Sequence, residues 1–339
     1  MLMSHRTKPS PTLPDPSVVS PTSFASPATS APPQRHSATP TTGGWRCTQT
    51  LRGHQSWVRT VAFSPDGRYI ASGSGDKKVA LWRQPHGDRP FYLEGHTAWV
   101  RCVAFSPQGH WLASASNDNT IGLWDVRRRS RVEVLQGHQS GVRAITFSPD
   151  GQYLFSGSQD QTIQVWRIAP DQPASAVKTL TGHQHWVRSL AVSPDGSTLA
   201  SGGQDHQVRI HRLQGRGTNH VLAGHEAAVH SVAISPNNWL LATGSADCTV
   251  RFWKLNSGRQ ITQFQAHSAA VNCVTFSPDG QLLATASSDK TVRLWHVDTG
   301  RLVGLLRGHE GWVWSVAFAP DSRTLVSSGW NGEIKIWTR

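Results

Sequence analysis

The chain has 339 residues, of which 37% are hydrophobic and 16% are charged, and its formal net charge is +12 at pH 7. It contains no apolar stretch long enough to span a bilayer, so the sequence predicts no membrane span. The excess of positive charge leaves acidic protein surfaces and nucleic acids as two classes of partner.

Residues 1–44 are rich in Pro, Ser, Thr and Ala and carry few large apolar side chains. Such a segment cannot bury enough surface to offset the entropy lost on ordering, which predicts a disordered N-terminal tail. The tail also lacks the apolar core of a secretory signal. Its low acidity, with Arg6 and Arg35, is shared with organellar transit peptides, so organellar targeting remains an alternative to a plain linker.

From residue 45 onward the chain repeats one unit, which residues 137–166 show most clearly as GHQSGVRAITFSPDGQYLFSGSQDQTIQVW. Three short apolar runs in this unit are bounded by turn residues, which is typical of strands. Between the first two runs, Ser148-Pro149-Asp150-Gly151 favours a tight hairpin turn because Pro restricts φ and Gly accepts a positive φ. A fourth run, residues 131–135 in the preceding unit, leads to each Gly-His. One unit therefore predicts a four-stranded antiparallel meander.

The unit occurs seven times, with a starting Gly-His, or Ala-His in the sixth copy, at residues 53, 95, 137, 182, 224, 266 and 308. The spacing is 42 residues, except for 45 between the third and fourth copies. A period of about 40–45 residues with four strands is typical of propeller blades. Because all but the fourth copy end their third strand in Trp, residues 45–339 resemble the WD-repeat β-propeller family.

This resemblance implies an all-β fold, a seven-bladed β-propeller of four-stranded antiparallel blades that is monomeric. Residues 45–51 are predicted to form a strand before the first Gly-His, whereas the last copy stops after three strands, at residue 339. The resemblance implies that the N-terminal strand completes the last blade and closes the ring. Closure removes the sheet edges that an open ring would expose.

The resemblance also implies a hydrogen-bonded relay of His, Asp, Ser or Thr, and Trp in the blades. The corresponding residues are His54, Asp76, Ser72 and Trp82; His96, Asp118, Ser114 and Trp124; His138, Asp160, Ser156 and Trp166; His225, Asp247, Thr243 and Trp253; and His267, Asp289, Thr285 and Trp295. In the fourth copy His211 replaces Trp, and in the seventh Asn331 replaces Asp, so we expect these two blades to be less rigid.

Ser, His and Asp are also the members of a hydrolytic triad. Their repetition in successive blades indicates a structural network instead, and the chain is expected not to be an enzyme. Seven of its seventeen His residues are blade markers. The others show no metal-ligand spacing, so no metal or other cofactor is expected. The four Cys residues also lack paired spacing, which favours a reducing, cytoplasmic compartment.

On one rim of the ring, called the top, family geometry places three outward positions per blade. These are the residues on either side of the Val in the WVR pattern and the residue before the relay Asp. Trp and Arg, which dominate binding hot spots, are concentrated there in blades seven and one to four. This predicts a partner surface formed by Trp57, Arg59, Trp99, Arg101, Arg143, Trp186, Arg188, Trp312, Trp314 and Trp330.

Two interpretations of these rim residues stay open. In the first, the arginines face an acidic or phosphorylated protein segment, because Arg binds carboxylate and phosphate groups bidentately. In the second, Trp and Arg only pack on each other as cation–π partners inherited through duplication.

The resemblance implies a non-catalytic scaffold for protein–protein interactions that works in a larger assembly. A competing hypothesis is a nucleic-acid-binding propeller, in which Trp stacks on bases and Arg contacts phosphates. A methyl-lysine reader ranks last. On the opposite rim, the arginine-rich stretch at residues 127–131 is interpreted as a solvated turn.

Overall fold

The computed structural model describes residues 43–85, 87, 89–169, 172–214 and 219–339. Of the tail predicted to be disordered, only Gly43 and Gly44 are among the described residues, where they form a turn. The described residues contain 28 strands. No helix among them has the length and apolar character that crossing a membrane requires.

The strands form seven separate four-stranded antiparallel sheets, the blades, each with its first strand innermost. Blade one contains, from the inside outward, β2 (Val58–Phe63), β3 (Tyr69–Ser74), β4 (Val79–Arg83) and β5 (Phe91–Leu93). In the same order, blade two contains β6 (Val100–Phe105), β7 (Trp111–Ser116), β8 (Ile121–Asp125) and β9 (Ser130–Leu135). Blade three contains β10 (Val142–Phe147), β11 (Tyr153–Ser158), β12 (Ile163–Ala169) and β13 (Gln172–Leu180).

The next three blades repeat the same order of strands. Blade four contains β14 (Val187–Val192), β15 (Thr198–Gly203), β16 (Val208–Arg212) and β17 (His220–Leu222). Blade five contains β18 (Val229–Ile234), β19 (Leu240–Ser245), β20 (Thr249–Lys254) and β21 (Gln260–Gln265). Blade six contains β22 (Val271–Phe276), β23 (Leu282–Ser287), β24 (Val292–His296) and β25 (Leu302–Leu306).

Blade seven joins the two ends of the ring and confirms the predicted closure. It contains β26 (Val313–Phe318), β27 (Thr324–Gly329), β28 (Ile334–Thr338) and, as its outer strand, β1 (Arg46–Leu51). Strand β1 pairs antiparallel with β28, with Leu51 opposite Ile334. Trp45 precedes β1, is only 3% exposed and packs edge-to-face against Phe318 with ring centroids 6.1 Å apart.

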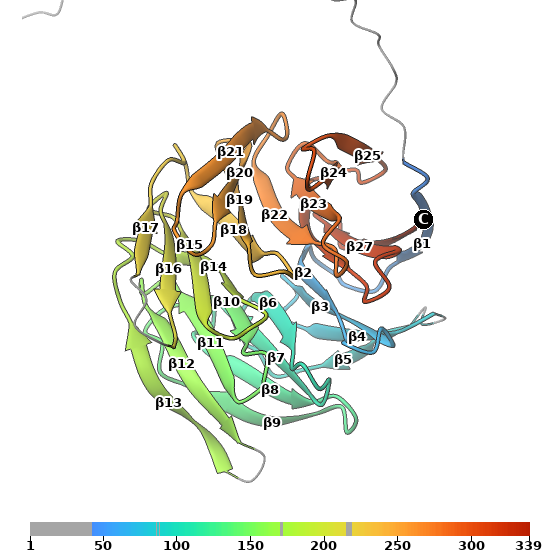
Figure 1. Ribbon diagram of the computed structural model, residues 1–339. Coiled ribbons are helices and arrows are strands. Elements are labelled where there is room, and N and C mark those ends of the chain that lie inside the picture. Colours follow the sequence, from blue (N-terminus) through green and yellow to red (C-terminus); the bar gives the residue numbers. More distant parts are fainter. Residues whose placement is uncertain (1–42, 86, 88, 170–171, 215–218) are drawn as a thin grey trace, which may run out of the picture. The chain divides into compact units, whose positions relative to one another are not determined.

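The inner strands of neighbouring blades contact one another in a closed cycle, from β2 through β6, β10, β14, β18, β22 and β26 back to β2. In Figure 1 the labels of β6, β10, β14, β18 and β22 lie toward the middle of the propeller, while β13, β17 and β21 lie outside. The seven-bladed antiparallel propeller predicted from the repeats is therefore confirmed.

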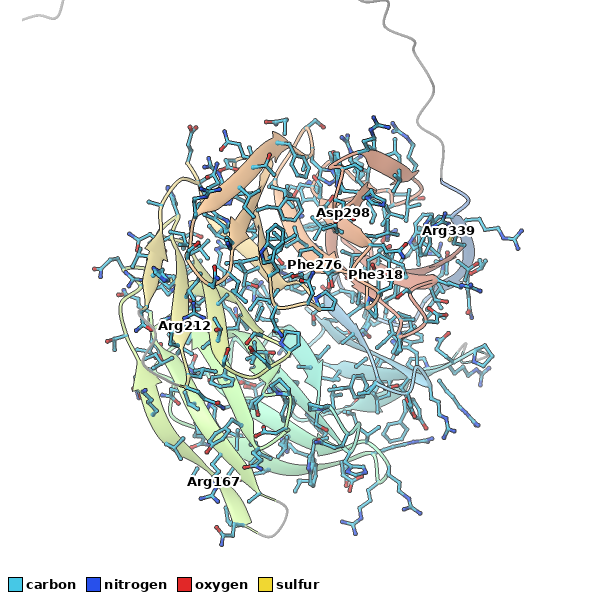
Figure 2. The ribbon with its side chains drawn as sticks, in the orientation of Figure 1. Arg167, Arg212, Phe276, Asp298, Phe318 and Arg339 are labelled. Carbon is cyan, nitrogen blue, oxygen red and sulfur yellow. The ribbon has the colours of Figure 1, made fainter. Side chains whose placement is uncertain are left out.

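Apolar clusters lie between neighbouring blades and hold them together. One of them combines Val58 and Trp82 of blade one with Leu51, Val326 and Ile336 of blade seven. Figure 2 labels Phe276 and Phe318, which occupy equivalent inner-strand positions of blades six and seven and are each 8% exposed. Because each blade buries its faces only against its neighbours, a single blade has no complete core of its own.

Hydroxyl side chains on the inner strands add polar links between blades. In each link a side-chain hydroxyl oxygen accepts a hydrogen bond from a backbone N–H of a neighbouring inner strand. The donor and acceptor residues are Val103 and Thr60 at 3.3 Å, Val232 and Ser189 at 3.0 Å, Val274 and Ser231 at 3.0 Å, and Val61 and Ser315 at 3.3 Å. These bonds satisfy backbone donors that would otherwise be buried without partners.

The relay is formed in detail in blade three. The Trp166 indole N–H donates to Ser156 Oγ at 2.8 Å, and Ser156 Oγ lies 2.8 Å from His138 Nε2. His138 Nδ1 lies 2.8 Å from Asp160 Oδ2. One arrangement of protons satisfies all three contacts: the Ser hydroxyl donates to Nε2, and the Nδ1 proton is donated to the carboxylate.

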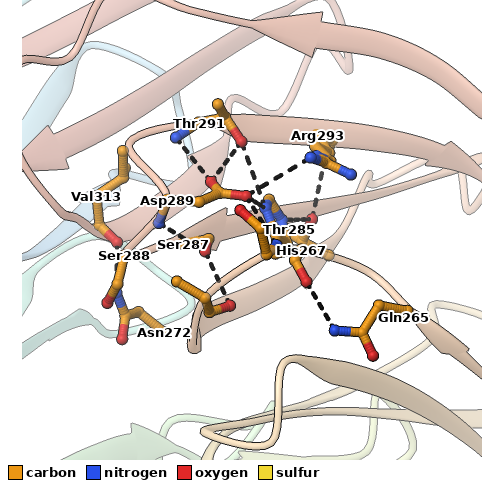
Figure 3. Close-up of polar contacts among 12 residues, drawn as sticks. Gln265, His267, Asn272, Thr285, Ser287, Ser288, Asp289, Thr291, Arg293 and Val313 are labelled. Carbon is orange, nitrogen blue, oxygen red and sulfur yellow. Dashed lines mark hydrogen bonds and ion pairs between the residues drawn. The ribbon is translucent and has the colours of Figure 1, made fainter.

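Blades one, two, five and six contain the same three contacts, at 2.7 to 3.0 Å between heavy atoms. Figure 3 shows the blade-six relay, in which Thr285 and Asp289 lie on either side of His267. Burial raises the pKa of Asp289, but hydrogen bonds from His267 and Thr291 outweigh it and the pKa lies well below its ordinary value. The relay carboxylates are therefore ionised, and the network joins two neighbouring strands of a blade to the loop that carries the His and to the turn that carries the Asp.

Blades four and seven differ as their sequences indicated. In blade four His211 takes the place of Trp and still reaches Ser201, with His211 Nε2 3.1 Å from Ser201 Oγ. In blade seven His309 Nε2 lies 2.7 Å from Ser327 Oγ, but His309 Nδ1 has no hydrogen-bond partner among the described residues. Burial lowers the pKa of both His211 and His309 from 6.5 to about 4.

Replacing His211 with Trp is expected to make the protein less sensitive to acid. In the folded wild type His211 stays neutral until about pH 4, whereas in the unfolded chain it takes up a proton near pH 6.5. Acid therefore favours unfolding across this window, and stability is lost as the pH falls from 6.5 toward 4. At about 1.4 kcal/mol per pKa unit, His211 contributes about 3 kcal/mol to this loss.

The measurement is urea unfolding of wild type and His211→Trp at several pH values from 7 to about 4, where the relay carboxylates are still ionised. The free-energy difference between the two proteins should grow as the pH falls. Parallel pH profiles would show that His211 does not titrate in this way.

Candidate functional site

One irregularity is common to all seven blades and lies where the inner strand begins. In blade three Val142 pairs with Ser158 and Ala144 with Gly157, so Arg143 has no partner across the hairpin. Register shifts occur at the equivalent position in the other six blades. Extra residues of this kind bend a strand and redirect a side chain. The seven residues, which we call the bulge ring, are Arg59, Arg101, Arg143, Arg188, His230, Asn272 and Trp314.

The four arginines of the bulge ring contact neutral acceptors. Arg101 Nε donates to Asn117 Oδ1 at 2.9 Å, and Arg188 Nε donates to Gln204 Oε1 at 2.5 Å. In blade three the Gln159 amide, oriented by its hydrogen bonds, accepts from Arg143 Nε at 3.0 Å. Asn117, Gln159 and Gln204 each stand one residue before the relay Asp of their blade. The sequence predicted that this position faces outward.

Arg59 differs because Gly75 stands at the amide position of blade one. Its Nη1 instead donates to the Trp314 carbonyl at 3.1 Å, across the junction between blades one and seven. Within the described residues, no carboxylate lies within 4.0 Å of any of the four guanidinium groups.

The four cations are close enough to affect one another. Burial and repulsion from Arg101, Arg188 and Arg59 lower the pKa of Arg143 to about 9. Burial and repulsion from Arg59 and Arg188 lower the pKa of Arg101 to about 10, and the pKa of Arg188 falls similarly. Arg101, Arg143 and Arg188 therefore remain charged at neutral pH, and burial also lowers the pKa of Arg59. The bulge ring therefore concentrates positive charge without an acidic partner, which favours anion binding.

Tryptophan rings support the guanidinium groups. Arg143 lies 4.2 Å above the Trp186 ring, Arg59 lies 4.8 Å above Trp314, and Arg101 lies 4.9 Å from Trp99. Trp57 and Trp99 also pack edge-to-face at 5.3 Å. Each arginine is thus held by stacking and by one neutral acceptor, as the packing interpretation expected. Because a guanidinium has five N–H donors, this packing leaves donors for a ligand.

Blade seven contributes a cluster of three tryptophans to the top rim. The Trp312 ring centroid lies 5.3 Å from those of Trp314 and Trp330, which are 6.3 Å from each other. Rings in mutual contact leave no space for an ammonium group between them, so the geometry does not support a methyl-lysine cage. The cluster instead forms an apolar platform, with Trp312 46% and Trp330 52% exposed.

The predicted rim residues fall into two layers. Trp99, Trp312 and Trp330 are exposed, whereas Trp57, Trp186, Trp314 and the four arginines are partly buried. The surface predicted from the sequence left out His230 and Asn272, because blades five and six contain few bulky rim residues. They could have been identified from their position in the repeat, because His230 and Asn272 stand where blades one to four have Arg.

The opposite rim contains the arginine-rich turn of blade two. Arg128 faces Asp125 at 3.8 Å, and Arg129 lies 5.2 Å above the exposed Phe91 ring. Trp239, on the turn between β18 and β19, is 50% exposed on this side. The described part of the chain contains no group of three or more His, Cys, Asp or Glu side chains placed to hold a metal ion. All four cysteines are free.

Comparison with known families yields seven matches, each of which contains the outer strand of one blade and the three inner strands of the next. The matching family is described as WD domain, G-beta repeat, and the matched residues are 45–83, 87–125, 129–167, 174–212, 217–254, 258–296 and 300–338.

Several known proteins share shorter stretches with the chain. Protein Mut11 of Chlamydomonas reinhardtii is 52% identical over 54 residues, which are 16% of this chain and 15% of that protein. The Notchless protein homolog of Arabidopsis thaliana is 60% identical over 37 residues, 11% of this chain and 8% of that protein. Protein transport protein SEC13 of Phaeosphaeria nodorum is 54% identical over 44 residues, 12% of this chain and 15% of that protein. Each stretch thus covers only a small part of the relative.

Proposed function

The chain belongs to the WD domain, G-beta repeat family, and from this premise we propose that it is a non-catalytic scaffold that binds a protein segment on its top rim. The segment is acidic or phosphorylated. It lies across the Trp platform of blade seven and the arginines of blades one to four.

The observation that carries this proposal is the uneven distribution of exposed tryptophan and unpaired positive charge around the rim. Trp99, Trp312 and Trp330 are about half exposed, and Trp side chains at such positions are typical hot spots of protein interfaces. Beside them are the four arginines that have no carboxylate partner among the described residues. Blades five and six carry Ala228, Ala246, Ala270 and Ser288 at the equivalent rim positions.

Replacing Trp312 and Trp330 together with Ala is expected to abolish capture of partner proteins from a lysate of the source cells. Loss of a Trp hot spot weakens binding by about 2 kcal/mol or more, which is about 30-fold for each residue. Thermal stability should change little, because both side chains are about half exposed. The measurement is quantitative mass spectrometry of the captured proteins, with a melting curve for each variant.

Trp239→Ala is the matched control, since it removes an equally exposed Trp from the opposite rim. Partners that are retained by Trp239→Ala but lost by the double variant bind at the top rim. If capture by the wild type disappears after nuclease treatment, the nucleic-acid hypothesis replaces this proposal. If Trp239→Ala and the double variant lose the same partners to the same extent, capture depends on exposed apolar surface in general and not on the top rim.

A further inference from the structure

The bulge ring lies around the axis of the propeller rather than on its outer face. Every bulge lies at the beginning of an inner strand, and the inner strands contact one another in a closed cycle. Arg59 donates to the Trp314 carbonyl, so members of the ring contact each other across the junction of blades one and seven. Burial, followed by Arg188 and Arg59, lowers the pKa of His230 in blade five.

Two other members of the ring have buried side-chain nitrogens without a hydrogen-bond partner in the described part of the chain, His230 Nδ1 and Trp314 Nε1. Buried polar groups normally bond to protein, water or a ligand. Asn272 differs, because its Nδ2 donates to the Val313 carbonyl at 2.9 Å and to Ser288 Oγ at 3.0 Å (Figure 3). The ring therefore combines four arginines with an imidazole that has one unpartnered nitrogen and an indole N–H without a partner.

We propose that the bulge ring is a phosphate subsite, in which Arg59, Arg101, Arg143 and Arg188 bind one phosphomonoester group of the protein segment and His230 takes up a proton as the phosphate binds. This inference rests on the proposed function and identifies the chemistry of the segment. The proton comes from water and converts His230 to imidazolium, which donates to a phosphate oxygen. No bond of the phosphate is broken.

Phosphate fits this ring better than carboxylate for two reasons. Its three terminal oxygens can accept donors from several blades at once, whereas a carboxylate has two oxygens. A phosphate dianion also offsets more of the repulsion between guanidinium groups, which together with burial lowers the pKa values of Arg101 and Arg143.

His230 is neutral in the unliganded protein. Burial, with Arg188 of β14 and Arg59 of β2, lowers its pKa to about 3, while Asn272 and the Val271 backbone of β22 oppose this weakly. A bound dianion reverses the surrounding charge, so the pKa of His230 rises. At any pH between its free and bound pKa values binding takes up a proton, and affinity for the dianion increases as the pH falls.

Sulfate is the probe that tests the site, because it stays a dianion where a phosphomonoester titrates near pH 6. Calorimetry of the full chain at pH 7 and pH 5 should show one sulfate per chain, bound at least several-fold more tightly at pH 5. Arg101→Gln and Arg143→Gln should each weaken binding about 10-fold or more, the loss of a charge-assisted bond. The control Arg167→Gln should not weaken it, since Arg167 is an exposed residue of β12, the third strand of blade three (Figure 2).

Histidine NMR supplies the second measurement. The His230 resonance, assigned from its loss in His230→Gln, should titrate about 2.5 pKa units higher or more in saturating sulfate, since a several-fold gain in affinity at pH 5 requires the bound pKa to rise above that pH. His230→Gln should still bind sulfate, but with an affinity that no longer depends on pH. An unchanged His230 pKa in saturating sulfate overturns the proton uptake, and failure of sulfate to bind overturns the subsite.

Three probes distinguish a phosphorylated protein segment from a free phosphate compound. They are a phosphothreonine peptide library, the same library with Thr, and inorganic phosphate. Retention of the phosphothreonine library alone, with release by sulfate, supports a phosphorylated segment. Binding of inorganic phosphate without any phosphopeptide shows that the occupant is a free phosphate compound and overturns this inference. If partners captured through Trp312 and Trp330 survive phosphatase treatment, the proposed function stands and the phosphate subsite is wrong.

Discussion

A chain that lacks residues 45–51 is expected to lose its cooperative unfolding transition. This deletion removes β1, exposes the edge of β28 and uncovers the cluster in which Trp45 packs against Phe318. Trp45 and Leu51 are 3% and 2% exposed. Truncation of such side chains alone costs about 3–5 kcal/mol for Trp and about 2–5 kcal/mol for Leu. Their sum is comparable with the whole stability of many domains, about 5–15 kcal/mol.

Two further variants make the result interpretable. Trp45→Ala should fold but lose about 3–5 kcal/mol in urea unfolding, while Arg46→Ala, which alters an exposed neighbour on the same strand, should unfold like the wild type. A chain that begins at residue 43 should also match the wild type, since it keeps every described residue. A normal melting curve for the chain without residues 45–51 would mean that β1 does not close the ring in solution.

His138→Ala is expected to destabilise the protein by about 1–3 kcal/mol, because it leaves Asp160 and Ser156 without their partner. The equivalent change His309→Ala should cost about 1 kcal/mol less. In blade seven only the contact of Nε2 with Ser327 is lost, since His309 Nδ1 has no partner among the described residues. Both histidines are 6% exposed, so differences in burial do not account for the contrast.

Urea unfolding at pH 7 measures both changes. Burial raises the pKa of Asp160, and the bonds from His138 and Thr162 keep it well below its ordinary value. Without His138 the pKa of Asp160 should lie closer to its ordinary value, so acid should remove the contribution of Asp160 to stability at a higher pH than in the wild type. His309→Ala should cause no such shift, since Asn331 stands where the other blades have Asp. Equal destabilisation by the two variants would contradict the relay as a source of stability.

Much of the architecture follows from local patterns in the sequence. Turn residues such as Ser148-Pro149-Asp150-Gly151 join strands that are adjacent along the chain, so the hairpins of each blade depend on short-range contacts. The missing fourth strand of the last repeat, together with the extra strand before the first, was enough to predict the pairing of β1 with β28. The relay residues could be located because the resemblance to the family implies which positions of each repeat they occupy.

The candidate site was only partly predictable. The repeats located the Trp and Arg residues of the rim, but not which of them are exposed. Arg59 donates to the carbonyl of Trp314, 255 residues away along the chain, and covers its ring. Such a contact arises only when the ring closes, and no local pattern reports it.

The number of blades and their strand order could be predicted from the sequence, because they follow from turn chemistry and from a repeat that cannot bury its faces alone. The closure of the ring was implied by the resemblance to the family. Which side chains of different blades come together depends on the closed ring. Seven strand bulges, each unremarkable within its own hairpin, bring residues of separate blades together. Burial and repulsion then lower the pKa values of Arg143 and His230, and the neighbours that cause this are distant in the sequence.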